Sequence, residues 1–445
     1  MGKLRDLLRE FAVRVVNKAD DPIPITGDID VQLDVATDLF ENQKVAQPFT
    51  VFDATFENHL QIDLFETILV GLGTRGYSPN EGSVTLNVGT EDGDEAIYVQ
   101  HGYNQFIDGK EFEIDMENTL PQKPNVRCRC GYFDRNNGWY FEVIDQEIWV
   151  VGESFVSGAM TNVFRVERAN WNVDTLDGNG PSGLTQGVDI DVFTFQRREI
   201  ITQGTFGKTQ FAFDIGGEVV VVHEEVTATV GNTGPAYERA SLPVRWEIKN
   251  IGVTASPTTM KVQSCSVKIF GEYDVTGFPF SASTGTASRN ITTRTAVIAI
   301  RVKTLFGPGN KTPRGVIKLS NANLAVSGGD VLWELILQKG HLGEANIGGS
   351  PTWTGINRST VDFTIDGTTV PLVTPTSGGE ALDQGYAIAA QGNNPGDRFQ
   401  DAGEIVHNIT LNDAGDQSDY LILVCTPTGN SATIEGAALK WTEFK

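Results

Sequence analysis

The sequence has little of what marks disulfide-rich, secreted or membrane proteins. Four cysteines occur in 445 residues, and two of them, Cys128 and Cys130, are neighbours on one expected strand. So few cysteines cannot form a disulfide framework for a chain of this size, and reduced thiols are expected. No apolar run approaches ~18 residues and no signal peptide is visible, so membrane insertion is not expected.

Positive charge is also scarce. The chain has 34 Lys and Arg residues against 57 Asp and Glu residues, which gives a formal net charge of −23. A surface of this sign repels phosphate backbones, and no dense basic cluster offsets it. Nucleic acid is therefore excluded as an expected partner.

The sequence motifs of several enzyme classes are missing. The five histidines show no H-x-x-x-H or H-x-H spacing, and no Cys-x-x-Cys accompanies them. Neither a G-x-S-x-G turn nor a glycine-rich phosphate loop before a helix occurs. The sequence predicts no cofactor and no metal centre.

What the chain does contain is the pattern of antiparallel sheets. Glycine is abundant (48 residues), and short runs such as Ser83–Val88 alternate apolar and polar side chains. Two such runs flank Gly216-Gly217, which predicts a tight hairpin. The predicted fold is mainly β: an antiparallel, jelly-roll-like β-sandwich at residues 45–275, a Gly/Ser/Thr-rich linker at 276–291 and a second β-sandwich at 292–445.

The first twenty residues follow a different, helical period. Their apolar side chains recur at the i, i+3, i+4 and i+7 spacings of an amphipathic helix, separated from the β region by a linker at 21–44. The apolar positions are Leu4, Leu7, Leu8, Phe11 and Val15. Three interpretations stay open: packing on the protein's own body, anchoring to another subunit during assembly, or binding at a membrane surface.

Three acidic residues alternate with apolar ones in the segment Glu113-Ile-Asp115-Met-Glu117. On a strand the three carboxylates share one face. An E-x-D-x-E strand in a jelly roll resembles the catalytic strand of laminarinase- and lichenase-like glycosidases. That resemblance implies Glu113 as nucleophile, Asp115 as electrostatic modulator and Glu117 as acid/base. Because the Trp-rich approach of those enzymes is missing, we favour a solvated acidic face and predict no catalytic residue.

Two other segments are candidates for ligand binding. Asp92 and Asp94 flank a glycine in an acidic turn, which could supply oxygen ligands to calcium or simply form a hairpin tip. Trp171 lies in a polar, glycine-rich segment, where an exposed ring would stack on a sugar, although core aromatics are commoner. The glycan-binding candidates are Trp171, Asn172, Asp174 and Asp177.

Four segments, taken in order, resemble a group of uncharacterised virion structural proteins of tailed bacteriophages, with a concanavalin-like jelly roll in the middle. They are Asn125–Glu142, Asn170–Gly183, Phe211–His223 and Leu242–Ile248. The resemblance implies a virion protein assembled in the host cytoplasm, with other virion proteins as partners.

The function predicted on this basis is a non-enzymatic structural protein of the tail, baseplate or tail fibre, which mediates assembly and adhesion. Two alternatives remain open: a capsid decoration protein, and a receptor-recognition protein that binds or degrades host surface glycans. A homo-oligomer is expected, with a trimer as the first choice.

Overall fold

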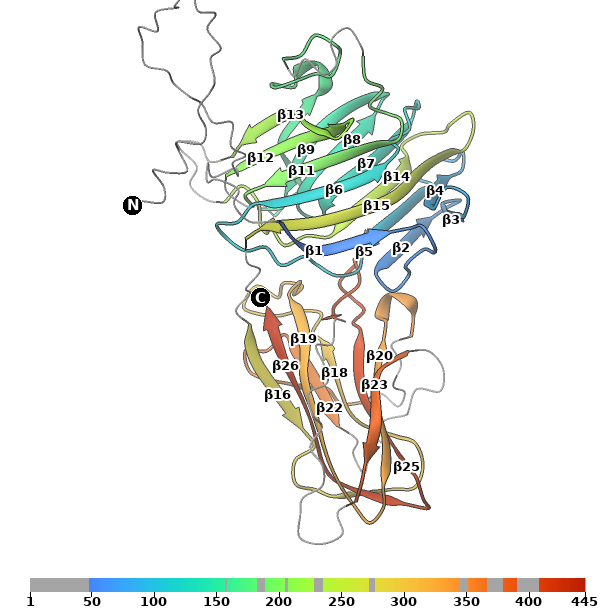
Figure 1. Ribbon diagram of the computed structural model, residues 1–445, viewed down its shortest axis with the longest axis vertical. Coiled ribbons are helices and arrows are strands. Elements are labelled where there is room, and N and C mark those ends of the chain that lie inside the picture. Colours follow the sequence, from blue (N-terminus) through green and yellow to red (C-terminus); the bar gives the residue numbers. More distant parts are fainter. Residues whose placement is uncertain are drawn as a thin grey trace, which may run out of the picture.

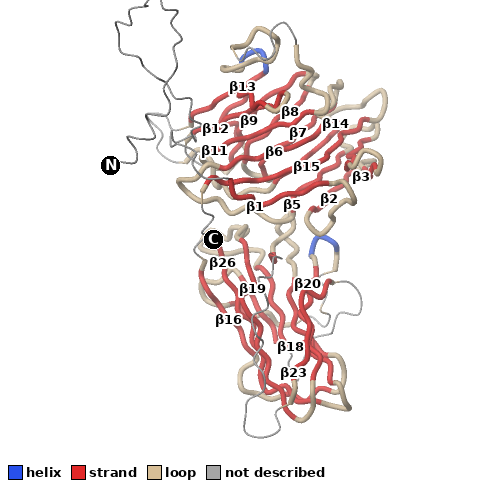
Figure 2. The backbone as a smooth tube through the Cα atoms, viewed as in Figure 1, coloured by secondary structure: helices blue, strands red, loops and turns tan. Residues whose placement is uncertain are grey.

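The computed structural model describes residues 48–156, 158–181, 189–204, 207–227, 235–271, 277–344, 347, 351–365, 379–389 and 408–444. There the chain forms two β-sandwiches that stand end to end (Figure 1). The described helices are two short 3-10 turns, η1 (Arg168–Asn170) and η2 (Gly340–Leu342) (Figure 2). None of the described helices is long and apolar enough to cross a membrane. The predicted mainly β fold is confirmed, while the N-terminal helix and its anchor residues lie outside the described residues.

The first sandwich consists of sheets I and II, and all of their strand pairs are antiparallel. Sheet I has the order β13-β12-β11-β6-β15-β4-β3, with β1 also on β15, and contains β1 (Pro48–Thr55), β3 (Thr74–Ser78), β4 (Ser83–Val88), β6 (Phe112–Asn118), β11 (Gln196–Thr202), β12 (Lys208–Ile215), β13 (Glu218–Val226) and β15 (Thr258–Phe270). Sheet II has the order β10-β9-β8-β7-β14-β5-β2 and contains β2 (Phe65–Val70), β5 (Glu95–Gln100), β7 (Val126–Phe133), β8 (Gly138–Ile144), β9 (Glu147–Ser154), β10 (Thr161–Glu167) and β14 (Val244–Asn250).

Alternation along β6 sets which side chains enter the core of the first sandwich. Phe112, Ile114 and Met116 are fully buried in the cluster between the two sheets. Elsewhere in this cluster, Phe141 of β8 meets Phe211 of β12 edge to face, with ring centroids 5.2 Å apart. Each fully buried apolar side chain contributes ~1.5–3 kcal/mol to folding. The opposite face of β6 is therefore free for polar side chains.

The predicted hairpin at Gly216-Gly217 is confirmed. These residues connect β12 to β13, and their φ angles are 69° and 92°. A two-residue turn of this kind needs positive φ at both positions, which glycine adopts without a steric penalty.

The second sandwich consists of sheets III and IV. Sheet III has the order β16-β26-β19-β24, with β17 also on β26, and contains β16 (Phe278–Ser283), β17 (Arg289–Ile291), β19 (Val316–Ser327), β24 (Asn408–Ile409) and β26 (Ala432–Phe444). Sheet IV has the order β21-β22-β18-β25-β20-β23 and contains β18 (Thr295–Val302), β20 (Val331–Gln338), β21 (Thr354–Gly355), β22 (Val361–Ile365), β23 (Glu380–Ala387) and β25 (Tyr420–Pro427).

The predicted linker at 276–291 is wrong. Its described part contains β16 and β17, which both pair with the C-terminal strand β26. Phe280 stacks near Trp441 with ring centroids 6.4 Å apart, and Ile291 is buried in the second core. Serine and threonine are compatible with an edge strand. The Gly-, Ser- and Thr-rich segment that predicted a linker therefore forms strands at the edge of sheet III.

The two sandwiches meet through polar and charged side chains. The loop between β24 and β25 carries Asp413, whose carboxylate accepts hydrogen bonds from Arg245 Nη1 at 2.9 Å and Arg135 Nε at 2.5 Å. The backbone N–H of Asp413 donates to the Glu66 carboxylate at 2.7 Å. Burial raises the pKa of Glu66, and the charge of Asp413 raises it further. A loop of the second sandwich is thus held by buried charges of the first.

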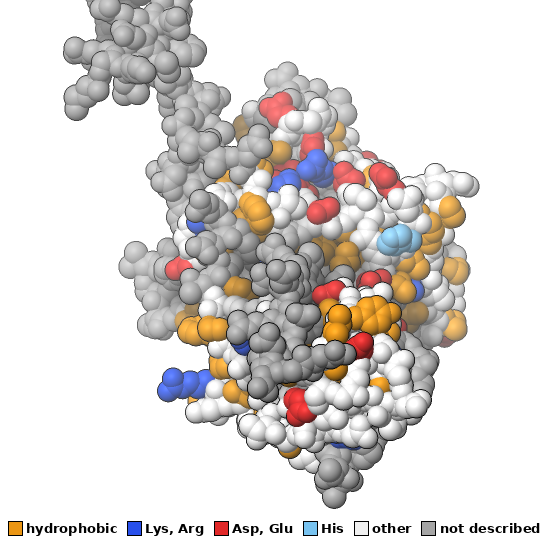
Figure 3. All heavy atoms as spheres, turned by 60° about the horizontal axis from the view of Figure 1, so that its bottom comes forward, with side chains coloured by type: hydrophobic (Ala, Val, Ile, Leu, Met, Phe, Trp, Pro, Cys, Tyr) orange, Lys and Arg blue, Asp and Glu red, His pale blue; other side chains and the backbone are white. Residues whose placement is uncertain are grey.

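The acidic character of the chain is visible on its surface. On the face shown in Figure 3, Asp and Glu side chains lie among hydrophobic and uncharged ones over the described part of the molecule. This mixture agrees with the net charge of −23.

The four cysteines are free and buried, as expected for reduced thiols. Burial raises the pKa of Cys130 to about 11 and that of Cys425 to about 12, and it also raises the pKa values of Cys128 and Cys265. Because the thiolate is the reactive form, iodoacetamide at pH 8 is expected to leave the native protein unmodified. Mass spectrometry should find full alkylation only in denaturant, and rapid labelling of the native chain would contradict this burial.

Candidate functional site

The carboxylates of β6 lie on the outward face of sheet I, as their alternation predicted. In the strand register, Asp115 is paired with Glu199 of β11 on one side and with Ser266 of β15 on the other. Glu113 lies two residues before Asp115 on the same face and is paired with Lys268. The centre of the sheet thus presents carboxylates beside hydroxyl and ammonium groups.

Two basic side chains hold Asp115 in its ionised form. Lys268 Nζ donates to the Asp115 carboxylate and, at 2.8 Å, to Glu113, while Arg197 Nη2 lies 3.2 Å from Asp115 Oδ1. Burial alone would raise the pKa of Asp115. The hydrogen bond and charge of Lys268, together with Ser266 and Arg197, outweigh burial and lower this pKa.

Glu199 has the opposite shift. Its residue is 3% exposed, and burial, followed by the negative charges of Asp115 and Glu113, raises its pKa to about 8. Glu199 is therefore mainly protonated at neutral pH and can donate a hydrogen bond to Asp115. One carboxylate oxygen from each of Glu113, Asp115 and Glu199 lies within 4.8 Å of the others. We call these three residues the carboxyl cluster.

The carboxyl cluster has the components of acid/base chemistry: a neutral carboxyl group that can give a proton beside a carboxylate that remains charged. Perturbed carboxyl groups of this kind gather at functional sites. A divalent cation is a poorer fit, since it would compete with the positive charges of Lys268 and Arg197.

Glu117, implied as the acid/base by the E-x-D-x-E resemblance, lies outside the carboxyl cluster. It accepts a hydrogen bond from Ser264 Oγ at 2.8 Å and is paired with Arg197 in the strand register. The carboxyl group with the raised pKa is Glu199, which comes from another strand. Sequence reasoning missed it because no local motif marks the Arg-Arg-Glu segment of β11.

Trp171 is not the exposed stacking platform that the glycan-binding hypothesis required. It is 5% exposed and belongs to the core of the first sandwich, with its ring centroid 6.2 Å from that of Phe213. Its indole N–H donates to the carbonyl of Val166 at 3.3 Å. The tryptophan anchors a polar loop to the core, which a glycine-rich sequence context did not reveal.

The other residues of that hypothesis mainly stabilise the same loop. Asn172 exchanges two hydrogen bonds with the backbone of Glu224, and the buried Asp174 accepts from the backbone N–H of Leu176 at 2.7 Å. Asp177 is exposed and accepts a backbone hydrogen bond two residues ahead. The structure does not bring these side chains together with Trp171 as a sugar-binding surface.

The predicted calcium turn has a structural role for its second aspartate. Asp94 is 2% exposed and accepts hydrogen bonds from the backbone N–H groups of Leu72 at 2.8 Å and Glu91 at 3.2 Å. Asp92 is exposed at the tip. Because Asp94 is turned inward to hold two loops together, the hairpin-tip interpretation fits better than the calcium interpretation.

Comparison with known proteins finds no close relative. No family model and no curated protein matches the chain. Among solved structures, similarity is found to the catalytic domain of an endo-1,3-beta-glucanase from Thermotoga petrophila (10% identity, TM-score 0.33, 50% of this chain and 98% of that chain) and to a Bacillus licheniformis beta-glucanase (11%, 0.32, 51% and 100%). A legume lectin-like domain from Entamoeba histolytica is also similar (10%, 0.30, 50% and 98%).

These neighbours are β-sandwich proteins of the jelly-roll type. Two of the three are named as glucan-cleaving enzymes, which contradicts the prediction that the chain is non-enzymatic. At 10–11% identity and TM-scores of 0.30–0.33, this likeness assigns no activity to the chain.

Proposed function

We propose that the protein binds and cleaves glycans at the outward face of sheet I, and that the carboxyl cluster is its active site. The observation that supports this proposal is the opposed pair of pKa shifts, with the pKa of Glu199 raised to about 8 and that of Asp115 lowered. Glycosidic cleavage needs two carboxyl groups in different protonation states at one pH.

Each member of the carboxyl cluster has a role in this reaction. Glu199 gives its proton to the glycosidic oxygen while the bond from that oxygen to the anomeric carbon breaks. Glu113, the most exposed of the three side chains at 16%, supplies the carboxylate that attacks the anomeric carbon. Asp115 accepts the hydrogen bond of Glu199 and, through its charge, keeps Glu199 protonated until substrate binds.

The spacing of the carboxyl groups favours a double-displacement reaction with retained configuration. The three oxygens lie within 4.8 Å of one another. Inverting enzymes need about 6.5–9.5 Å between their carboxyl groups, because a water molecule attacks from the opposite side of the sugar. At the shorter spacing, a covalent glycosyl-enzyme intermediate on Glu113 is the expected course. Water then attacks the anomeric carbon and breaks the bond to Glu113, while the ionised Glu199 takes the proton from that water and is protonated again.

The setting that we propose is recognition of a host surface by a bacteriophage particle. The resemblance of roughly residues 50–275 to virion proteins of tailed phages supports it. The acidic surface is consistent with it, because such a surface disfavours nucleic acid as the partner. Purified protein is expected to compete with whole particles for adsorption to host cells. Imaging of particles that carry the labelled protein separates a tail position from a capsid position.

Cleavage is tested by release of reducing ends from host envelope polysaccharide and from soluble β-glucans. Glu199→Gln and Glu113→Gln are each expected to lower the rate by at least about 100-fold, the usual contribution of a positioned acid or nucleophile. Glu117→Gln is the matched control, because Glu117 shares the strand and face but lies outside the carboxyl cluster. Its rate should stay within a few-fold of the unmodified protein.

Two outcomes would contradict the proposal. One is that the unmodified protein releases no reducing ends from any of these substrates. The other is that Glu117→Gln lowers the rate as much as Glu199→Gln, which would indicate a general effect on the acidic face.

A further inference from the structure

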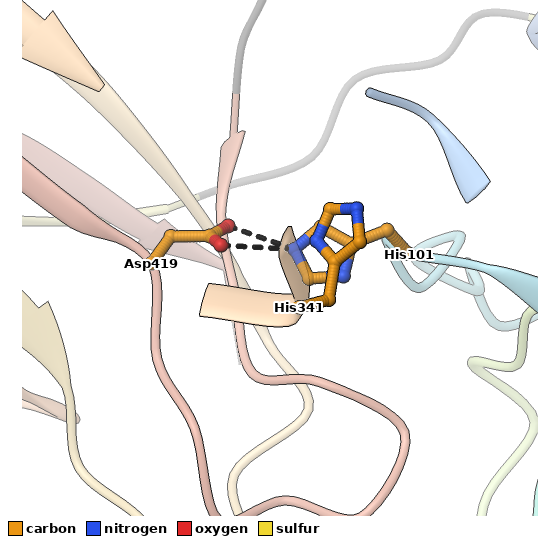
Figure 4. A group of neighbouring side chains, drawn as sticks. All are labelled: His101, His341 and Asp419. Atoms are coloured by element: carbon orange, nitrogen blue, oxygen red, sulfur yellow. Dashed lines mark hydrogen bonds and ion pairs between the residues drawn. The ribbon is translucent and has the colours of Figure 1, made fainter. Parts of the chain in front are cut away.

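A second cluster of chemically active side chains lies where the two sandwiches meet. His101 directly follows β5 of the first sandwich, whereas His341 lies in η2 and Asp419 directly precedes β25, both in the second. Figure 4 shows the two imidazole rings lying against each other with the Asp419 carboxylate facing the ring of His101. We call these three residues the joint cluster.

The joint cluster is compact. His101 Nε2 is 3.0 Å from Asp419 Oδ1 and 2.9 Å from Oδ2, and the centroids of the two imidazole rings are 3.8 Å apart. One nitrogen from each histidine and one oxygen of Asp419 lie within 4.8 Å of one another. Asp419 is itself held in place, because it also accepts the backbone N–H groups of Gly340 at 2.8 Å and Thr410 at 3.2 Å.

Each imidazole of the joint cluster has one nitrogen paired and one unpaired. Nε2 of His101 faces the Asp419 carboxylate, and Nε2 of His341 lies 3.0 Å from the carbonyl oxygen of Ile62. The Nδ1 atoms of both rings are buried without a hydrogen-bond partner, and His101 as a whole is 5% exposed. Buried polar atoms normally have partners, so these two unpaired nitrogens need an explanation.

The partner of His341 Nε2 explains the unpaired Nδ1 of that ring. A histidine that binds a metal typically donates its other ring N–H to a carboxylate or a backbone carbonyl, which fixes the ring and leaves a lone pair for the ion. His341 has the carbonyl partner in Ile62, so its Nδ1 is the nitrogen left for an ion. His101 Nε2 and the Asp419 carboxylate face each other at 2.9 Å, so an ion bound between them would take the place of the Nε2 proton. We propose that His101, His341 and Asp419 bind one zinc ion, which joins the two sandwiches.

The donor set selects the class of ion. Two imidazoles and one carboxylate suit zinc and neighbouring first-row transition metals, whereas magnesium and calcium prefer oxygen ligands throughout. Because His101 comes from one sandwich and the other two ligands from its neighbour, the full set exists only while the sandwiches are docked. Zinc therefore stabilises the docked arrangement by mass action.

The test uses the full chain after treatment with a chelator. Equilibrium dialysis against zinc chloride is expected to give one zinc per chain. Zinc at one hundred times its Kd should raise the Tm by about 5 °C, whereas magnesium chloride should not change it. His341→Ala should weaken zinc binding at least about 100-fold, while His59→Ala removes an exposed histidine outside the joint cluster and should have no effect.

Cobalt(II) provides a readout that needs no variant, in case His341→Ala does not fold. Bound cobalt is expected to give a visible absorption band of nitrogen and oxygen ligation, which one equivalent of zinc removes. The proposal is overturned by a zinc stoichiometry near zero with no cobalt band, or by a folded His341→Ala protein that binds zinc as tightly as the unmodified chain.

Discussion

Glu199→Gln is expected to stabilise the protein increasingly as the pH rises. The pKa of Glu199 is about 8 in the folded chain, against an ordinary value of 4.5. Between these values the folded state holds a proton that the unfolded state has lost, so the free energy of unfolding falls as the pH rises through this window. Glutamine keeps a donor for Asp115 and has no proton to lose. The variant should match the unmodified protein near pH 4 and exceed it above pH 8 by an amount on the order of a few kcal/mol.

Urea unfolding at pH 4, 6, 8 and 9 measures this difference. Glu117→Gln is the control, since it removes a carboxylate from the same face without touching the carboxyl cluster. A difference between Glu199→Gln and the unmodified protein that is constant with pH would show that Glu199 has the same pKa in the folded and the unfolded chain.

Combined with the rates of glycan cleavage, the same variant separates function from structure. If a carboxyl group serves only to stabilise the fold, its replacement should lower the free energy of unfolding. If a carboxyl group serves proton transfer, its replacement lowers the rate of cleavage. The same replacement raises the free energy of unfolding, because the site disfavours the charged form of the group. Opposite signs in the two measurements are therefore the expected result for Glu199.

The parts of the fold that the sequence could predict depend on local alternation. Phe112, Ile114 and Met116 enter the core because every second side chain of a strand faces the same way. Gly216-Gly217 forms a hairpin because both positions need positive φ. The linker predicted at 276–291 is wrong because this segment has no such local pattern. Its strands β16 and β17 are defined by pairing with β26, more than 140 residues away in the register Arg289↔Ile434.

The candidate sites depend on pairings that no local pattern encodes. The E-x-D-x-E segment marked the right face of β6, but the partner of Asp115 is set by the register of β11. The joint cluster combines His101 with Asp419, which are 318 residues apart in sequence. The absence of H-x-x-x-H spacing therefore excluded a local metal motif but not a site assembled by docking of two domains.

Asp413→Ala is expected to be the most damaging single substitution at the junction of the sandwiches. The Asp413 side chain is 1% exposed and pairs with Arg245, whose own side chain is 5% exposed. Burial disfavours the charge of Arg245, but the negative charges of Asp413 and Glu247 outweigh burial and raise its pKa. Removing one partner of a buried ion pair leaves the other charge buried and costs about 3–5 kcal/mol. Because Glu247 still pairs with Arg245, a loss of about 3 kcal/mol is expected.

The matched control is Asp416→Ala, which removes an exposed carboxylate from the same loop and should change stability by less than about 0.5 kcal/mol. Thermal unfolding and limited proteolysis of the full chain distinguish two kinds of loss. If the junction alone opens, the cores of the two sandwiches stay intact and the chain becomes sensitive to protease near the β24–β25 loop before either core unfolds. Equal stability of Asp413→Ala and Asp416→Ala would mean that the Arg245 charge is already satisfied by Glu247, and that the two sandwiches are held together by other contacts.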